Sequence, residues 1–201
     1  ENAAMSLAVL RSRALSGIDA PAVSVEVHLA NGLPSFTIVG LPDTEVKESK
    51  DRVRAAIQNS RFEFPARRIT VNLAPADLPK ESGRFDLAIA LGILAASRQI
   101  PHTHLDAHEF AGELSLSGDL RPIRGALAMA YALSRNPASA DGEAPLTRAF
   151  VLPTENAAEA ALVSGTKVLP ARTLIEVCDH LSAPDRKLVP ALPAPVDADI
   201  R

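Results

Sequence analysis

The sequence is poor in aromatic residues, which make up 3% of its 201 residues, with no tryptophan and one tyrosine. Aromatic rings are the surfaces on which proteins stack single-stranded bases, so little base stacking is expected. The core must instead be built from valine, leucine, isoleucine and alanine. The apolar share of 47% is ordinary for a folded chain and argues against global disorder.

Cysteine is almost absent, because Cys178 is the single example and forms neither an internal disulfide nor a thiolate metal cage. No apolar run reaches the roughly 18 residues that cross a membrane, and no basic-then-apolar leader opens the chain. The net charge of −3 gives no overall attraction to nucleic acid or anionic lipid. These features predict a cytoplasmic protein without a membrane partner.

A phosphate-binding loop is also missing. Such a loop needs Gly-x-x-x-x-Gly-Lys followed by Ser or Thr, because backbone amides and one lysine must reach the phosphates together. None of the five lysines follows a glycine, and no dinucleotide fingerprint occurs. We therefore expect no nucleotide cofactor in this segment.

Hydrophobic periodicity predicts strands first and mixed elements later. The two-residue alternation over residues 23–29 predicts a half-buried strand, and residues 6–14 and 35–39 flank it as an antiparallel meander. A helix is expected after the capping residue Asp43. Further expected elements are strands at 69–73, 149–152 and 167–169, a hairpin over 110–122, and helices at 87–96, 126–134, 155–163 and 173–181. This order predicts a two-layer α/β (α+β) domain, with helix 87–96 its most buried element.

The ends of the chain differ from the middle in composition. Met5 is the expected natural start, so residues 1–4 are interpreted as a remnant of expression. Residues 183–201 are rich in proline and are predicted to be a linker. The polar stretch 136–145 is an insert to which we assign no role.

Three histidines raise the question of a metal site. His102, His104 and His108 lie close together with Asp106 nearby, and clustered imidazoles can bind zinc. The third histidine would have to fold back to join the other two. A solvated connecting loop is the favoured interpretation, and no metal site is predicted.

Lys80 and Ser82 raise the question of nucleophilic catalysis. A serine can be activated by a neutral lysine amine if burial lowers the lysine pKa. Residues this close in sequence seldom converge, and Lys80 follows Pro79 in an expected loop. We therefore expect Lys80 to be exposed and charged, and keep a serine peptidase using Ser82 as the alternative function.

A local excess of positive charge lies between residues 47 and 68, a stretch that contains seven basic and three acidic residues. Such asymmetry can mark a surface for phosphates. Helical neighbours of opposite charge, such as Glu48 and Arg52, are equally typical of an ordinary solvated face. The candidates for contact with DNA are Lys50, Arg54, Arg61, Arg67 and Arg68.

Several blocks together resemble the N-terminal domain of the Mg-chelatase-like family, also called the YifB or ComM family. The resemblance covers about residues 5–182, and its blocks agree in order and spacing. They are Val39-Gly40-Leu41-Pro42-Asp43, Lys47-Glu48-Ser49, Asp51-Arg52-Val53-Arg54-Ala55-Ala56, Asn72-Leu73-Ala74-Pro75-Ala76-Asp77, Lys80-Glu81, Arg84-Phe85-Asp86-Leu87 and the run from Phe110 to Pro122.

The resemblance implies a fold similar to the proteolytic domain of Lon protease, of the ribosomal S5 domain 2 type. Matching the Lon nucleophile segment from Lys80 places Arg84 at the position of the nucleophile. Matching the Lon base segment to the run from Pro122 places Leu127 at the position of the lysine base. A guanidinium that stays protonated and an isobutyl group cannot form a catalytic dyad, so no peptidase activity is expected.

In the resembled family this domain precedes an AAA+ ATPase module, which the linker would join. ComM members are similar to hexameric DNA helicases that drive branch migration during natural transformation. The implied function is a non-catalytic accessory domain that aids ring assembly or DNA placement. Its implied partners are the ATPase module, neighbouring subunits of a hexamer and possible DNA, while ATP and Mg would be cofactors of the absent module.

Overall fold

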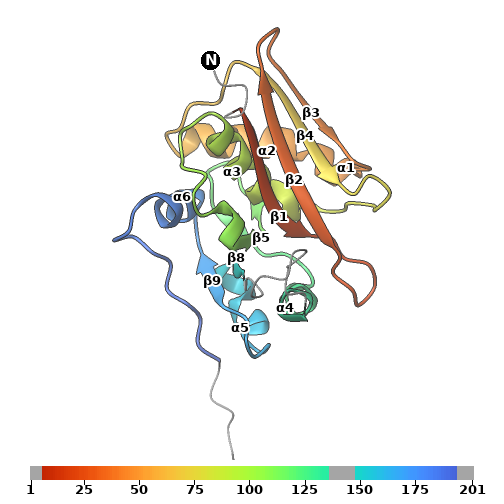
Figure 1. The fold of residues 1–201 in the computed structure, drawn as a ribbon, viewed down its shortest axis with the longest axis vertical. Helices are drawn as coiled ribbons and strands as arrows, with labels where there is room; N and C mark the ends of the chain where they lie inside the picture. The colour runs from red at the N-terminus through yellow and green to blue at the C-terminus, as the bar shows by residue number, and fades with distance from the viewer. Residues whose placement is uncertain (1–5, 136–147, 194–201) are drawn as a thin grey trace, which may run out of the picture.

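A computed structural model describes residues 6–135 and 148–193 of the chain. Its largest sheet has the strand order β1-β2-β4-β3, formed by β1 (Leu7–Arg13), β2 (Ala22–Ala30), β4 (Arg68–Ala74) and β3 (Ser35–Val39). Figure 1 shows helices behind one face of this sheet and a second group of strands and helices below it. The predicted mixture of helices and strands in an α/β class is thereby confirmed.

The alternation in β2 was a reliable signal, since Val23, Val25, Val27 and Leu29 are all buried. β1 and β4 flank β2 and run antiparallel to it. The predicted meander is wrong in its third strand, because β3 pairs in parallel with β4 and not with β2. Parallel neighbours need a crossover connection, and the helices between β3 and β4 provide it.

Three helices lie with this sheet: α1 (Thr44–Lys47), α2 (Ser49–Asn59) and α3 (Asp86–Ala96). α3 packs on β1 and β2, α2 packs against α3, and α1 contacts α2. Asp43 caps α1 by accepting a 2.8 Å hydrogen bond from the Val46 amide. Every residue of α3 is buried, as predicted. A Cβ at Gly92 would lie 2.5 Å from Val27 Cγ2, so the glycine allows α3 to approach β2 closely.

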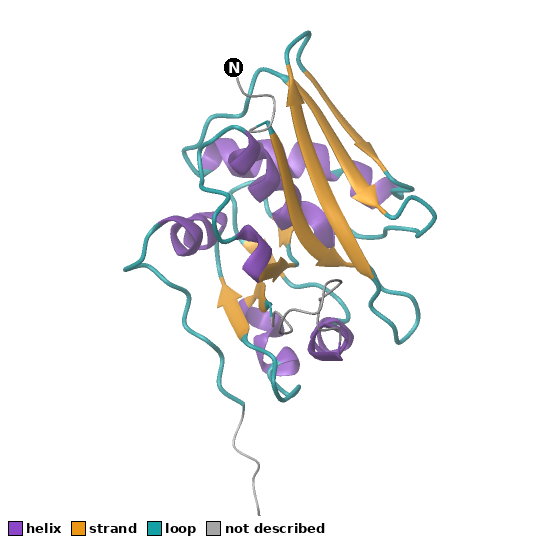
Figure 2. Cartoon of the chain, in the orientation of Figure 1, coloured by secondary structure: helices purple, strands orange, loops and turns teal. Residues whose placement is uncertain are grey.

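The second part of the molecule contains a parallel sheet of order β5-β8-β9 and a small hairpin (Figure 2). The sheet strands are β5 (His108–Phe110), β8 (Ala149–Pro153) and β9 (Val168–Ala171), and the predicted hairpin is confirmed as β6 (Glu113–Leu114) with β7 (Leu120–Arg121). Three helices complete this part: α4 (Ala126–Arg135), α5 (Ala157–Ala160) and α6 (Leu174–Ser182). Short 3₁₀ turns occupy Gly83–Phe85, Leu105–Ala107 and Thr154–Asn156.

A buried ion pair joins β1 of the first sheet to β5 of the second. Arg13 Nε lies 2.8 Å from Glu109 Oε2, and Arg13 Nη2 lies 3.1 Å from Glu109 Oε1. The remaining guanidinium nitrogen donates to the Ala20 carbonyl at 2.9 Å. Two parallel bonds from one arginine fix orientation as well as distance, so this pair sets how the two sheets meet.

Residues 183–193 contain no helix or strand, and they return to the domain surface. Leu188 packs against the main core, and the Ala191 amide donates to the Val168 carbonyl at 2.9 Å. The predicted remnant at 1–4 and the insert at 136–145 lie outside the described residues. None of the helices that the structure describes has the length and apolar character needed to cross a membrane.

Candidate functional site

A cavity of about 710 Å³ opens beside the 3₁₀ turn that precedes α3. This is the region where the resemblance to Lon protease predicts the nucleophile. The lining is mixed in charge, with more carboxylates than guanidinium groups. The lining residues are Leu15, Asp43, Thr44, Glu45, Glu81, Ser82, Arg84, Glu113, Pro122, Ile123 and Arg124.

Arg84 reaches into the protein from this cavity wall and is 4% exposed. Its Nε donates to Ser82 Oγ at 3.1 Å, and its Nη1 donates to the Arg124 carbonyl at 3.2 Å. Nη1 also lies 3.5 Å from the Met129 sulfur on α4. Burial lowers the pKa of Arg84, but a guanidinium starts so high that it stays charged at neutral pH. The predicted nucleophile position therefore holds a fixed cation.

Ser82 is the nucleophile of the alternative function, and its hydroxyl is hydrogen-bonded to Arg84. The backbone φ of Ser82 is +66°, a value that residues other than glycine seldom adopt. Its Oγ accepts a hydrogen bond from Arg84, which has no lone pair with which to take a proton. The contact can hold the hydroxyl in place but cannot make it a nucleophile.

Lys80 is 1% exposed, so the prediction of a solvent-exposed lysine was wrong. The loop before it folds back beside the start of α1, where the Lys80 amide donates to Leu41 O at 3.2 Å and its carbonyl accepts from the Asp43 amide at 3.0 Å. Burial lowers the pKa of Lys80, the direction that a catalytic amine requires. Its ammonium nevertheless donates to the Pro75 carbonyl, while the Ser82 hydroxyl bonds to Arg84.

Leu127, the position matched to the lysine base, lies on α4 and is 42% exposed. Its amide donates to Glu159 Oε1 at 3.1 Å, on the side of α4 that meets α5. The α4 residue that contacts Arg84 is Met129, which no sequence argument had singled out. The structure therefore does not bring the two matched dyad positions into one cavity.

A buried polar network lies where α2, α3 and the hairpin meet. Asp86 is fully buried, accepting from Arg52 Nε at 2.7 Å, from the Leu114 amide at 3.1 Å and from the Ser49 hydroxyl. Burial raises the pKa of Asp86, and these three donors oppose the rise by favouring the carboxylate. Sequence analysis paired Arg52 with Glu48, an ion pair that is present at 3.7 Å but lies at the surface.

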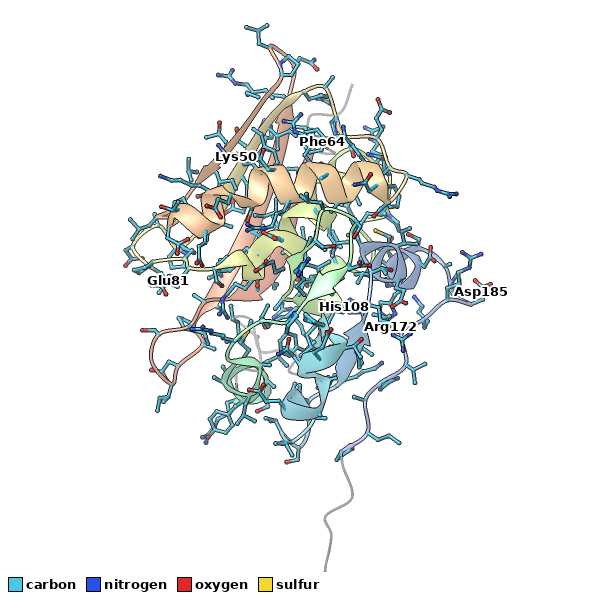
Figure 3. The ribbon with its side chains drawn as sticks, turned by 180° about the vertical axis from the view of Figure 1, so that it is seen from behind. Lys50, Phe64, Glu81, His108, Arg172 and Asp185 are labelled. Atoms are coloured by element: carbon cyan, nitrogen blue, oxygen red, sulfur yellow. The ribbon has the colours of Figure 1, made fainter. Side chains whose placement is uncertain are left out.

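Two of the five basic candidates for DNA contact lie together. Arg54 and Arg67 line a common pocket of about 250 Å³. Arg68 lies at an exposed position of β4, Arg61 is exposed after the end of α2, and Lys50 is half-buried in the first turn of α2. Figure 3 shows Phe64, which lines the same pocket, and Glu81 of the larger cavity on opposite sides of α2.

The histidines separate in space. His102 and His104 are exposed, whereas His108 is buried and its Nε2 lies 2.8 Å from Nε2 of His180 on α6. His180 Nδ1 accepts from the Leu188 amide at 2.9 Å, which leaves its Nε2 to donate to His108. Within residues 6–135 and 148–193, no three ligand-type side chains are placed to hold a metal ion.

Comparison with known proteins defines the class. The family model described as subunit ChlI of Mg-chelatase matches residues 25–156. The chain belongs to this Mg-chelatase-like family, and specifically to its YifB/ComM group.

The relatives are similar over nearly the whole chain. It is 49% identical over 182 residues to competence protein ComM of Haemophilus influenzae, covering 90% of this chain and 34% of that protein. It is 47% identical over 201 residues to YifB of Salmonella typhimurium, covering 98% and 38%. It is 46% identical over 194 residues to YifB of Escherichia coli, covering 96% and 36%. The chain thus spans about a third of each relative's length.

Proposed function

We propose that this chain is a non-hydrolytic accessory domain of a ComM-type AAA+ protein, with a Lon-like fold, and that it helps to place DNA near the motor during branch migration. The observation that carries the first part is the side chain of Arg84. It stands at the position that the Lon resemblance matches to the nucleophile, is 4% exposed and donates a hydrogen bond to the hydroxyl of Ser82. No amine is bonded to that hydroxyl in the described part of the chain, so a lysine base of the Lon type is not beside it.

ATP and Mg belong to this proposal only through the ATPase module. The 201 residues contain no phosphate-binding loop, so their side chains do not fit an ATPase site. The nucleotide and its metal would be bound in the part of the relatives that this chain does not span. The domain would act on the motor by contact with it or with neighbouring subunits of a hexamer.

Placement of DNA is favoured by the arginines beside α2. Arg54 and Arg67 share a pocket whose lining contains no carboxylate. Exposed cations bind phosphates largely independently of the base sequence, as expected for a domain that places DNA near a motor. Ring assembly is the other form of the proposal, and it does not require these arginines.

Two measurements test the proposal. Casein and unstructured peptides should remain uncleaved by the wild-type chain and by Ser82→Ala; cleavage that Ser82→Ala abolishes would establish the peptidase alternative. The wild-type chain should bind single-stranded or branched DNA at low salt and lose affinity as salt rises. If it binds neither DNA at low salt, DNA placement is refuted while ring assembly survives.

A further inference from the structure

We infer that the pocket between α2 and the start of β4 is a binding site for a backbone phosphate of a nucleic-acid strand, an inference that rests on the proposed placement of DNA. The pocket has a volume of about 250 Å³. It is lined by residues from three separate segments: Pro34, Ser35, Arg54, Gln58, Phe64, Pro65, Ala66 and Arg67.

The position of Arg54 is fixed without the use of its hydrogen-bond donors. Its Cζ lies 4.5 Å from the centroid of the Phe64 ring, a cation–π contact. The Phe64 ring is itself stacked with Phe36, with ring centroids 5.8 Å apart. Within the described residues Arg54 makes no ion pair or side-chain hydrogen bond. Stacking therefore holds the cation at the pocket while its N–H groups stay free for a ligand.

Arg67 brings a second cation to the same pocket. Its Nη2 lies 3.5 Å from the Leu29 carbonyl, a long contact. Its Nε is buried and has no hydrogen-bond partner among the residues that the structure describes. A buried charged N–H without an acceptor is costly, and such groups in folded proteins call for an explanation. An anion bound in the pocket beside this guanidinium would offset its charge.

The remaining lining selects for an anion. Arg54 and Arg67 are the charged residues that line the pocket, so two like charges face one cavity without a lining carboxylate between them. Gln58 and Ser35 add an amide and a hydroxyl that can donate to oxygen. Two guanidinium groups with neutral donors match a phosphate, whose oxygens accept several bonds.

The aromatic ring of Phe64 stacks with an arginine and is not expected to stack with a nucleic-acid base. Phe64 contacts Arg54 and Phe36 within the protein, and the chain has few other rings with which to stack bases. Phosphate contacts position a strand but do not read its sequence. Binding through this pocket should therefore have similar affinity for oligonucleotides of different base composition.

The test compares binding of a fluorescent single-stranded oligonucleotide by three proteins across a salt series. Arg54→Gln combined with Arg67→Gln should weaken binding by about tenfold per arginine and reduce the log–log salt slope by about 0.7, the value for one phosphate contact on a single strand. Arg121→Gln is the matched control. Arg121 is exposed on β7, and its side chain makes no bond in the described part of the chain. This control should change affinity less than twofold.

A variant without a change of charge separates the pocket from general electrostatics. Phe64→Leu removes the ring that holds Arg54 and should weaken binding severalfold, while Phe64→Tyr should restore it. Circular dichroism would confirm that each variant is folded.

The outcomes distinguish this inference from the proposed function. If the wild type binds the oligonucleotide and the double arginine variant behaves like Arg121→Gln, the pocket is not a contact and DNA placement stands. If the wild type binds no single-stranded oligonucleotide at low salt, this inference fails, while DNA placement fails only if branched DNA is not bound either. If inorganic phosphate shifts the Nε–H resonances of Arg54 and Arg67 and the oligonucleotide does not, the pocket takes free phosphate and the nucleic-acid assignment is overturned.

Discussion

Replacing Arg52 with methionine tests how much the buried network around Asp86 depends on its cation. Asp86 is fully buried, and Arg52 bonds it with Nε at 2.7 Å and Nη2 at 3.2 Å. Methionine retains much of the side-chain length but leaves the carboxylate with only the Ser49 hydroxyl and the Leu114 amide as donors. A buried charge that loses its partner costs about 3–5 kcal/mol.

The assay is thermal unfolding followed by circular dichroism near neutral pH. In a domain of this size each kcal/mol moves the Tm by about 2–4 °C, so Arg52→Met should lower it by roughly 6–20 °C. Glu48→Gln is the matched control, because it removes the 3.7 Å surface ion pair to the same arginine. That pair is exposed on the Glu48 side and should contribute less than about 1 kcal/mol.

The pH dependence gives a sharper test of the same reasoning. Burial raises the pKa of Asp86, and loss of Arg52 removes an opposing effect, so the pKa should rise further in the variant. A folded-state pKa above the unfolded value, about 3.9, makes the folded protein the better proton binder between the two values. The variant should therefore regain stability as the pH falls through that window. A penalty below about 1 kcal/mol, or one that grows on acidification, would refute the argument.

Three further predictions concern other parts of the fold. Gly40→Ala should destabilise the domain by at least about 2 kcal/mol in urea unfolding, because φ is +106° and the new Cβ would lie 2.1 Å from the Leu73 carbonyl oxygen; an unchanged midpoint would contradict this. Glu109→Gln should cost about 3 kcal/mol in thermal unfolding by leaving the buried arginine of β1 without its counterion, and a loss below about 1 kcal/mol would argue against the pair. Burial lowers the pKa of His180 to about 4, below the unfolded value of about 6.5. Protonation of His180 therefore favours the unfolded state, and the free energy of unfolding should decrease as the pH falls from about 6.5 to about 4. The hydrogen-exchange protection factor of the Leu188 amide, which donates to His180 Nδ1, should fall over the same window, and constant protection would exclude this linkage.

The strands and helices were largely predictable because their signals are local. Alternating valines marked β2, and the uninterrupted apolar run marked α3 as the central helix. The hairpin was expected over residues 110–122, and its two short strands lie inside that range. The last helix was expected at 173–181 and is found at Leu174–Ser182. Each of these depends on side chains only a few residues apart.

Strand pairing was less predictable than the strands themselves. β3 lies beside β4 because the intervening helices form a crossover, a choice that the alternation of β3 does not reveal. Sequence analysis also placed Lys80 in solvent because it follows Pro79 in an expected loop. The loop folds against the start of α1, and the lysine is buried there.

The sequence alone determined the family and the α/β class, because these follow from residue identity and order. Tertiary structure alone decided which polar side chains meet. Asp86 with Arg52, Glu109 with Arg13, and His108 with His180 are separated by 34, 96 and 72 positions. No local pattern encodes such partners, since each pair forms only when the packing of sheets and helices removes water from both side chains.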